Sequence, residues 1–380
     1  MPPRVLIFRN VLLAASETFI LAQAGALKDF TPVYAGLYPY PESLQLPSSP
    51  VLLSSSSAIP DRIRRRVYMR FPIAPLFHAR LRSAYVSLIH AHFAFDGATA
   101  LPISKHLNVP LVVTLHGYDV TMGDDALERL PGGRTFQRRR EELWARASVF
   151  LCISKFIRDQ ALAKGYPEAK LRLHYTGTDL SLFQPSRSER DPNLILFVGR
   201  LVEKKGCSYL LDAVAILKRN NPAVRLVMIG DGYLGPSLRE RVNAERLPCE
   251  FLGNQPAHIV RDWMRRAQVF CAPSVHASNG DSEGLGMVFI ESQAVGTPVV
   301  SFDHGGIGEV VLDKVTGLLA PERDSTMLAA YLERFLSDRS LWAEFSRRGI
   351  ENAKNRFDIV TQTGRLEVLY SAAIAEFKPA

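Results

Sequence analysis

The sequence has 380 residues, of which 47% are hydrophobic and 22% charged, and its formal net charge is +8. This length and balance are typical of a soluble globular protein with two domains. No apolar run approaches the roughly 20 residues that a membrane-spanning helix needs, and the first residues lack the apolar region of a signal peptide. The four cysteines are far apart and indicate small buried side chains in a reducing compartment. We therefore expect a cytoplasmic protein.

The first half of the chain alternates between short apolar strands and helical stretches. The predicted strands are rich in Val, Ile and Leu, as in a sheet buried on both faces, and comprise residues 4–8, 86–90, 110–115 and 149–153. Helical patterns lie between them, as at 97–106 and 136–147. This alternation predicts a parallel sheet. A polar segment with two prolines, residues 180–192, indicates a linker.

A second series of strands and helices follows the linker. Its predicted strands are residues 194–198, 225–229, 250–252, 269–272, 299–302 and 317–319. The last stretch, about 325–378, is almost wholly helical in pattern. We predict an α/β protein of two Rossmann-like domains that face each other across a cleft. The first domain is residues 1–180, to which a C-terminal helix at about 360–380 returns, and the second is residues 190–358.

The excess positive charge lies entirely in the first half. Residues 1–186 hold 22 Lys and Arg against 14 Asp and Glu, whereas residues 187–380 hold 24 against 24. Part of the excess is a run of arginines between Arg62 and Arg82, interleaved with aromatic residues such as Phe71. This mixture predicts contact with an anionic membrane surface, although a solvated basic helix face would give the same pattern. No nucleic-acid-binding motif is present, so no nucleic acid partner is predicted.

Glu283 and Glu291 bracket a glycine-rich turn and an apolar run. Glu283 would lie at the carboxyl end of the strand at 269–272, where parallel α/β sheets bind their ligands. Glu291 would lie on the following helix, whose N-terminus offers free N–H groups to a phosphate. Its neighbours on that helix are apolar, and a carboxylate on an apolar face is costly unless something binds it. The pair predicts a ligand site, although Glu291 alone would also fit a solvated helix residue.

Three further residues follow predicted strands. Arg200 and Lys205 flank the turn after the first strand of the second domain, where two cations can neutralise a diphosphate leaving group. The alternative is a pair of exposed loop cations. His116 follows the strand at 110–115 and could donate a hydrogen bond to a substrate or a developing charge.

We predict no required metal. His90 and His92 alternate at the end of a strand, and we expect them to point to opposite faces, which argues against both binding one ion. No Asp-x-Asp pair lies in a strand-end loop, because Asp124 and Asp125 belong to a polar surface segment. Ser16, after the first strand, is a candidate helix N-cap or a substrate contact.

These residues together resemble the retaining glycosyltransferases of family 4, which have the GT-B fold. The resemblance covers essentially the whole chain and is most specific in the second domain, at Gly199-Arg200, Lys205-Gly206, Gly230-Asp231-Gly232, Phe251-Leu252-Gly253 and the pair of Glu283 and Glu291. In the first domain, Ser16–Ile20, His90–His92 and Thr114–Asp119 look like enzymes of bacterial exopolysaccharide and lipopolysaccharide assembly.

The resemblance implies transfer of a sugar from a nucleotide diphosphate donor to a glycan or lipid-linked acceptor, with an α-linkage in the product and no cofactor. Arg200 and Lys205 would bind the donor diphosphate. Glu291 would hold the ribose hydroxyls, and the main chain near Gly253 would contact the base.

The resemblance also implies catalytic roles for Glu283 and His116, both of which would contact the donor sugar. The amides at the glycine-rich turn would contact the sugar or a phosphate; these residues are Gly284, Leu285 and Gly286. Ser16 and Glu17 would lie on the acceptor side.

One departure concerns the loop after the first strand, where many family members carry a Gly-Gly pair. Here the loop is residues 10–16 and is bulkier, so backbone contacts to phosphate are not expected there. Two other classes of function remain open: a nucleotide-sugar epimerase of the same fold, and a non-catalytic nucleotide-sugar-binding protein.

Overall fold

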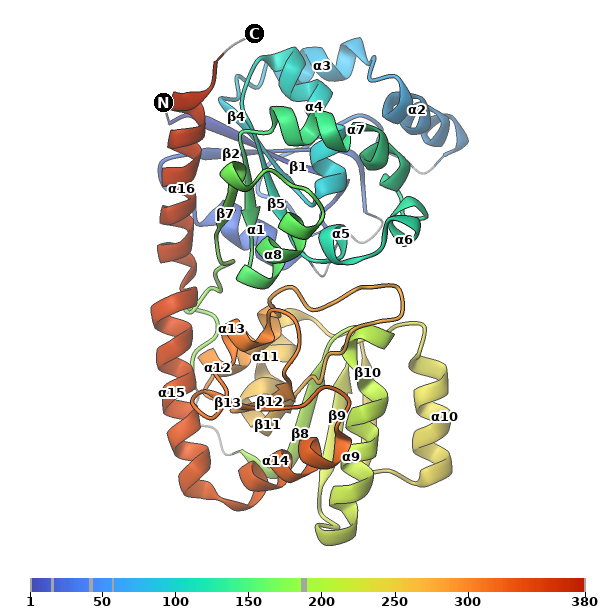
Figure 1. The fold of residues 1–380 in the computed structure, drawn as a ribbon, viewed down its shortest axis with the longest axis vertical. Coiled ribbons are helices and arrows are strands. Elements are labelled where there is room, and N and C mark those ends of the chain that lie inside the picture. The colour runs from blue at the N-terminus through green and yellow to red at the C-terminus, as the bar shows by residue number, and fades with distance from the viewer. Residues whose placement is uncertain (1, 15–16, 41–43, 57, 186–189, 379–380) are drawn as a thin grey trace. The chain divides into compact units, whose positions relative to one another are not determined.

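The structure is a computed structural model that describes residues 2–14, 17–40, 44–56, 58–185 and 190–378. The chain divides into two compact units, which are Met1–Gly177 together with Ile359–Ala380, and Thr178–Asp358 (Figure 1). Each unit has its own parallel sheet, so the predicted α/β class with two Rossmann-like domains is confirmed. Within the described residues, no helix is both long enough and apolar enough to cross a bilayer.

The first unit is built on a parallel sheet, in which the described residues form seven strands in the order β3-β2-β1-β4-β5-β6-β7. The strands are β1 Arg4–Leu12, β2 Thr31–Pro39, β3 Val51–Leu52, β4 Leu88–His92, β5 Leu111–Leu115, β6 Val149–Cys152 and β7 Leu171–Leu173. The central strands β4, β5 and β6 are buried along their whole length, as expected where helices cover both faces. The sequence prediction ends β1 too early and omits β2, β3 and β7. β2 contains two prolines and a glycine, which are typical of turns, and β3 and β7 are only two and three residues long.

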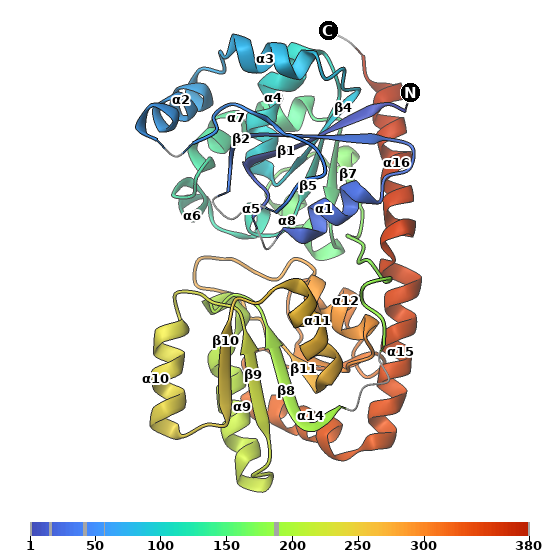
Figure 2. The same cartoon turned by 180° about the vertical axis from the view of Figure 1, so that it is seen from behind.

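Helices cover both faces of this sheet. α1 contacts α16 (Figure 2), whereas α4 packs on β1, β4 and β5 and contacts α7. The α-helices of the unit are α1 Thr18–Gly25, α2 Ile59–Arg70, α3 Pro75–Arg82, α4 Ala94–Leu107, α5 Tyr118–Thr121, α6 Asp124–Glu128, α7 Gly133–Arg146, α8 Lys155–Ala163 and α16 Ile359–Glu376, and a 3-10 turn spans Glu168–Lys170.

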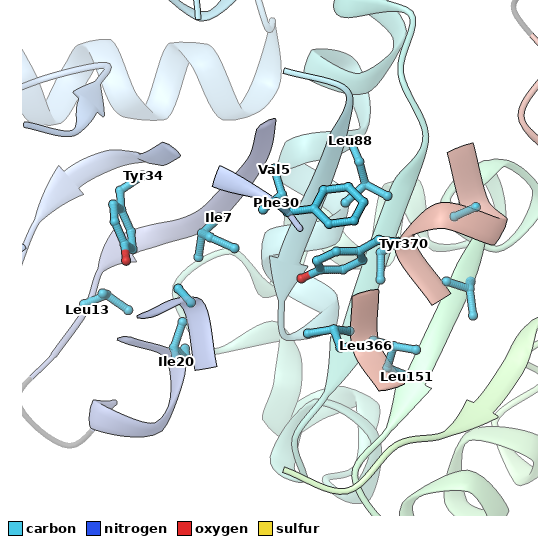
Figure 3. Close-up of a cluster of buried hydrophobic side chains, with 14 of the residues drawn as sticks. Val5, Ile7, Leu13, Ile20, Phe30, Tyr34, Leu88, Leu151, Leu366 and Tyr370 are labelled. Carbon is cyan, nitrogen blue, oxygen red and sulfur yellow. The ribbon is translucent and has the colours of Figure 1, made fainter. Parts of the chain in front are cut away.

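The C-terminal helix α16 is part of the core of the first unit (Figure 3). Its Leu366 and Tyr370 belong to one buried cluster with Val5 and Ile7 of β1. The ring of Tyr370 packs edge-to-face on Phe30, with centroids 5.2 Å apart. The predicted return of the C-terminal helix to the first domain is therefore confirmed.

The second unit is also built on a parallel sheet, formed by six strands within the described residues in the order β10-β9-β8-β11-β12-β13. The strands are β8 Asp191–Val198, β9 Arg225–Ile229, β10 Cys249–Gly253, β11 Ala267–Cys271, β12 Val299–Phe302 and β13 Gly317–Ala320. α9 contacts α14, and α12 contacts α11 and α15. The α-helices are α9 Cys207–Asn220, α10 Gly235–Glu245, α11 Ala257–Arg266, α12 Met287–Ala294, α13 Ile307–Val310, α14 Ser325–Ser337 and α15 Arg339–Phe357, and a 3-10 turn spans Glu203–Lys205.

Candidate active site

The strand order of the second sheet reverses between β8 and β11, since β9 and β10 continue on one side and β12 and β13 on the other. Open parallel sheets bind ligands at the carboxyl ends of the two strands that flank such a reversal. The loop after β8 carries Arg200 and Lys205, and the loop after β11 carries Glu283. The topology therefore brings together side chains that lie 78 positions apart in the chain.

Lys205 and Glu283 form an ion pair at this edge, with Nζ 2.5 Å from Oε2. The hydroxyl of Ser274 donates to the same carboxylate oxygen at 3.2 Å. Burial opposes ionisation of Glu283, which is 8% exposed, but the charges of Lys205 and Lys204 and these two hydrogen bonds outweigh it and lower its pKa to about 2. Glu283 is therefore a fixed negative charge at neutral pH.

The backbone of Glu283 is held as firmly as its carboxylate. Its carbonyl oxygen accepts the N–H of Gly306 at 2.9 Å, and its own N–H donates to Nε2 of His304 at 3.3 Å. Nδ1 of His304 lies 2.7 Å from Oε2 of Glu322, which assigns the proton to Nδ1 and leaves Nε2 free to accept. Gly305 permits the approach, because at its φ of +56° a Cβ would lie 2.4 Å from the Glu283 carbonyl oxygen.

Glycines allow the backbones of the loops after β8, β9 and β11 to pack closely against one another. Gly206 has φ +63°, and a Cβ there would lie 1.8 Å from the carbonyl oxygen of Pro273. At Gly230, with φ +126°, a Cβ would lie 2.0 Å from the carbonyl oxygen of Gly199. Gly253, at the end of β10, also has a positive φ but borders open space. The three loops therefore have a fixed backbone, and the main chain at Gly253 is accessible to a ligand.

Arg200 is exposed at the end of β8. Its guanidinium makes no hydrogen bond or ion pair with another residue of the described ranges, in contrast to the paired ammonium groups of Lys204 and Lys205. An unpaired guanidinium in the loop that also carries Lys205 can bind an incoming anion without breaking an existing contact.

Helix α12 begins directly after the turn that contains Gly284 and Leu285. Gly286 precedes it with φ +83°, where a Cβ would lie 2.4 Å from the ring of Phe289. Glu291, one turn into the helix, is half-buried, and its carboxylate has no hydrogen-bond or ion-pair partner within the described ranges. Burial raises the pKa of Glu291 to about 7. A ligand that donates hydrogen bonds to the carboxylate would offset the free energy lost when the ionised group is buried.

His116 follows β5 of the first unit and is held by its own loop. Oδ1 of Asp119 accepts the N–H groups of His116 and Gly117 at 3.1 and 2.8 Å. The His116 ring packs on Phe19 and Phe93, with centroids 5.1 and 4.5 Å apart. Burial, together with the charge of a nearby arginine, lowers the pKa of His116 well below its usual value, so the imidazole is neutral.

His92 determines which nitrogen of His116 carries the proton. Nδ1 of His92 lies 3.0 Å from Nε2 of His116, and Nε2 of His92 is buried without a partner in the described ranges. An unpaired buried N–H is costlier than an unpaired acceptor, so we assign the His92 proton to Nδ1. His116 then accepts at Nε2 and keeps its own proton on Nδ1, where it can donate.

The expectation that His90 and His92 point to opposite faces is wrong. Both lie within β4, and side chains two residues apart in a strand share a face. Their ring centroids are 4.2 Å apart. His90 is bonded on both sides, with Nδ1 2.5 Å from the Tyr370 hydroxyl and Nε2 2.7 Å from the Thr114 hydroxyl. Within the described ranges, no group of three or more His, Cys, Asp or Glu residues could hold a metal ion.

Glu17 is engaged in a buried charge cluster. Its carboxylate pairs with the guanidinium of Arg9, which also pairs with Asp96. Glu17 accepts the N–H of Ala14 at 3.1 Å as well, so it orders the loop after β1. Ser16 lies outside the described residues.

Two family models match the chain in succession. The model described as Glycosyltransferase Family 4 matches residues 30–182, and the model described as Glycosyl transferases group 1 matches residues 180–356. The chain belongs to the family 4 glycosyltransferases.

Similar proteins include biosynthetic enzymes of several kinds. The amylovoran biosynthesis glycosyltransferase AmsK of Erwinia amylovora is 31% identical over 249 residues, which are 64% of this chain and 60% of AmsK. The D-inositol 3-phosphate glycosyltransferase of Frankia alni is 30% identical over 284 residues, which are 66% of each chain. The family 4 chain thus matches about 60 to 66% of the length of these curated relatives.

Anabaena HepE, solved in complex with UDP and glucose, has the same fold as this family 4 chain. The TM-score is 0.75 at 20% sequence identity, and the match covers 97% of this chain and 100% of HepE. At this identity the likeness shows the fold alone, which is GT-B.

Of the family 4 site residues predicted from the sequence, Arg200, Lys205 and Glu283 lie in the segments that follow β8 and β11, and Glu291 lies within α12. His116 lies in the first unit. Three residues that hold the site lie outside the motifs named from the sequence, and they are Ser274, His304 and Glu322. His92 and Asp119 lie within the first-domain motifs, but the sequence does not indicate their positioning roles. Ser274, His304 and Asp119 closely follow β11, β12 and β5, and a search for polar residues after every predicted strand would find them.

Proposed function

We propose that the protein is a retaining glycosyltransferase that moves a sugar from a nucleotide diphosphate donor to a glycan or lipid-linked acceptor. The observation that carries the proposal is the ion pair of Lys205 and Glu283 at the strand reversal of the second sheet, together with the unpaired Arg200 in the loop after β8. At this edge of the sheet, the cationic side chains can bind a diphosphate, and the buried carboxylate can bind the attached sugar ring.

The donor would bind along the carboxyl edge of the second sheet. Arg200 and Lys205 would bind the diphosphate, and the N–H groups at the start of α12, after Gly284 to Gly286, would add hydrogen bonds. Glu291 would accept hydrogen bonds from the two ribose hydroxyls, because its half-buried carboxylate lacks any other partner in the described ranges. The main chain at Gly253 would contact the base, since it borders open space.

The reaction would proceed on one face of the sugar. The bond between the anomeric carbon and the phosphate oxygen breaks as the acceptor oxygen bonds to that carbon, and the leaving phosphate takes the acceptor proton. If the donor sugar is α-linked to the diphosphate, the product would also be an α-glycoside. Arg200 and Lys205 would stabilise the leaving diphosphate, and this electrostatic effect would supply most of the rate enhancement. Glu283, ionised at neutral pH, would bind the sugar hydroxyls and stabilise the developing positive charge.

His116 would complete the donor contacts as a neutral hydrogen-bond donor through Nδ1. We propose that the reaction needs no metal ion and no cofactor, because two cationic side chains can perform the charge neutralisation that a metal performs elsewhere. The transferred sugar would be a hexose.

The pathway would be assembly of a surface polysaccharide, either an exopolysaccharide or a lipopolysaccharide. The similarity to AmsK supports this proposal, since that relative is named for amylovoran biosynthesis. We propose a cytoplasmic enzyme that makes peripheral contact with the inner face of the plasma membrane, where a lipid-linked acceptor is accessible. The excess of basic residues in the first half of the chain supports that contact.

Proton NMR of donor turnover tests the proposal without a known acceptor. The purified protein is incubated in EDTA with UDP-, GDP- and ADP-hexoses, so that water serves as a slow acceptor. We expect release of one nucleoside diphosphate together with a sugar that first appears as the α-anomer, and we expect neither from Glu283→Gln. Release of the β-anomer would contradict retention, and a changed nucleotide sugar without release would favour an epimerase. An unchanged donor, bound equally by the variant, would favour a non-catalytic binding protein.

A further inference from the structure

Exposed apolar side chains gather in one part of the first unit. Fifteen large hydrophobic residues are exposed in the described ranges, and seven of them lie between residues 59 and 85. They are Ile59, Ile63, Val67, Phe71, Ile73, Leu76 and Tyr85. The first four belong to α2 or follow it directly, and α2 lies at the periphery of its unit next to α3 (Figure 1). This concentration is more than the scattered exposure that a soluble surface normally shows.

One side of α2 is anchored to the rest of the unit. Tyr68 is buried, and its hydroxyl lies 3.1 Å from Nε2 of His78. Arg65 lies over the ring of Tyr38, 4.1 Å from its centroid, and donates to the Ser54 hydroxyl at 2.9 Å. These contacts fix the rotation of α2, so the opposite side of the helix faces solvent.

The outward side of α2 carries an apolar row and a basic row. Ile59, Ile63 and Val67 are spaced by four residues, which aligns them along one side of the helix, and they are 70%, 56% and 51% exposed. Phe71 continues the row and is 55% exposed. A second row consists of arginines that precede members of the first by one position, about 100° around the helix; these are Arg62, Arg66 and Arg70. All three arginines are exposed.

We propose that α2 and its connection to α3 form a docking surface for an anionic phospholipid bilayer. A helix with adjacent apolar and basic rows lies in the plane of a membrane interface, with its apolar side chains at the acyl boundary and its arginines at the phosphates. The inference deepens the proposed function, on which it rests for the lipid-linked acceptor that would be met at the membrane.

Two grooves beside the α2–α3 connection fit the same partner. One, of about 710 Å³, is lined by Leu76 together with Arg64 and Arg80. The other, of about 830 Å³, is lined by Ile73 together with basic side chains that include Arg82 and Lys105. Ile73 and Leu76 are 78% and 75% exposed. Each groove therefore combines an exposed aliphatic side chain with cations. The cations could bind the phosphate of a phospholipid headgroup, and the aliphatic side chain could contact its first acyl carbons.

The charges argue against a second copy of this chain as the occupant. Two copies joined through their apolar rows would bring the two arginine rows close together, and like charges across an interface are unfavourable. The first half of the chain, with its net charge of +8, would add to that repulsion. An anionic bilayer instead provides one negative layer for the arginines and one apolar layer beneath it.

Vesicle co-sedimentation of the full-length protein tests the proposal. The probes are vesicles of phosphatidylglycerol with phosphatidylcholine, and vesicles of phosphatidylcholine alone. Three proteins are compared first: the wild type, Ile63→Asn with Val67→Asn, and Arg62→Gln with Arg66→Gln and Arg70→Gln. We expect the wild type to bind the anionic vesicles and each variant to bind them at least 10-fold more weakly, with about 100-fold for the triple variant, since each arginine near the surface contributes about 1 kcal/mol.

Matched controls separate this surface from general charge and hydrophobicity. Val360→Asn with Val368→Asn removes two exposed apolar residues from α16, and a triple change to Gln at Arg129, Arg134 and Arg146 removes three exposed arginines. Both controls should bind anionic vesicles as the wild type does.

Three outcomes would overturn the proposal. They are a wild type that does not bind anionic vesicles, α2 variants that bind as tightly as the wild type, and α2 variants that change only the oligomeric state in gel filtration. Binding of soluble nucleotide by the α2 variants keeps the two proposals apart. If nucleotide binding persists while vesicle binding is absent from all proteins, only the docking surface is wrong.

Discussion

Replacing Glu291 by Gln removes a carboxylate that the free protein holds half-buried and unpaired within the described ranges, and we expect the substitution to stabilise the free protein at pH 8. The pKa of Glu291 is raised from 4.5 to about 7 by burial. Each tenfold change in acidity is worth about 1.4 kcal/mol, so this interval sets an upper limit of about 3 kcal/mol on the gain. Because water reaches part of the carboxylate, we expect a gain of about 1 to 2 kcal/mol in the free energy of unfolding.

The pH dependence follows from the direction of the shift. Between about 4.5 and 7 the folded protein binds a proton at Glu291 that the unfolded chain has released, so the wild type loses stability as the pH rises through this window. Gln at this position does not titrate. The advantage of Glu291→Gln should therefore be largest at pH 8 and should mostly disappear at pH 5.

Urea denaturation of both proteins at pH 8 and pH 5 measures the effect, with Glu245→Gln as the control. Glu245 is exposed and paired with Arg241, so its replacement should give no gain at either pH. The same Glu291→Gln protein should bind nucleoside diphosphate more weakly, because it loses the acceptor for the ribose hydroxyls. A variant that is less stable than the wild type at pH 8, or equally better at both pH values, would refute the reasoning.

Three further substitutions probe the rest of the site. Lys205→Ala leaves the buried Glu283 carboxylate without its ion-pair partner and should cost about 3 kcal/mol in urea denaturation, with much of the loss recovered when Glu283→Gln is added. His92→Phe removes the hydrogen bond to Nε2 of His116, so ¹⁵N NMR should show the His116 proton redistributed between its two nitrogens, whereas an unchanged tautomer would contradict our assignment. Gly206→Ala places a Cβ 1.8 Å from a carbonyl oxygen and should prevent stable folding, whereas Gly253→Ala, beside open space, should lower the melting temperature by only a few degrees.

The sequence predicts the site best for charged residues that follow predicted strands. Arg200, Lys205 and Glu283 each lie after a short apolar run, and the carboxyl ends of parallel strands meet at one edge. The position of each residue in the segment after its strand therefore predicts that all three lie at the same edge, since β8 and β11 are neighbours in the sheet. The helical position of Glu291 on an apolar face similarly predicts its partial burial.

The sequence cannot predict contacts that depend on tertiary packing. His304 accepts the N–H of Glu283 only because β12 brings it to the neighbouring loop, and no local pattern encodes that pairing. Arg9 gives a similar case, since its carboxylate partners come from the β1–α1 loop and from α4. The error at His90 and His92 is of another kind, because the period of a strand is two and the pair had to share a face.

Calorimetric titration of UDP, GDP and ADP in EDTA, with the wild type, Arg200→Ala and Arg219→Ala, tests the diphosphate site most directly. Arg219 is an exposed arginine in the last turn of α9, at the opposite end of that helix from the loop that carries Arg200, and serves as the control. We predict that one nucleotide binds without metal, that Arg200→Ala weakens it about 10-fold or more, and that Arg219→Ala leaves it unchanged. If no nucleotide bound, or if Arg200→Ala bound it as tightly as the wild type does, the donor site would be wrongly placed and the proposed reaction would lose its basis.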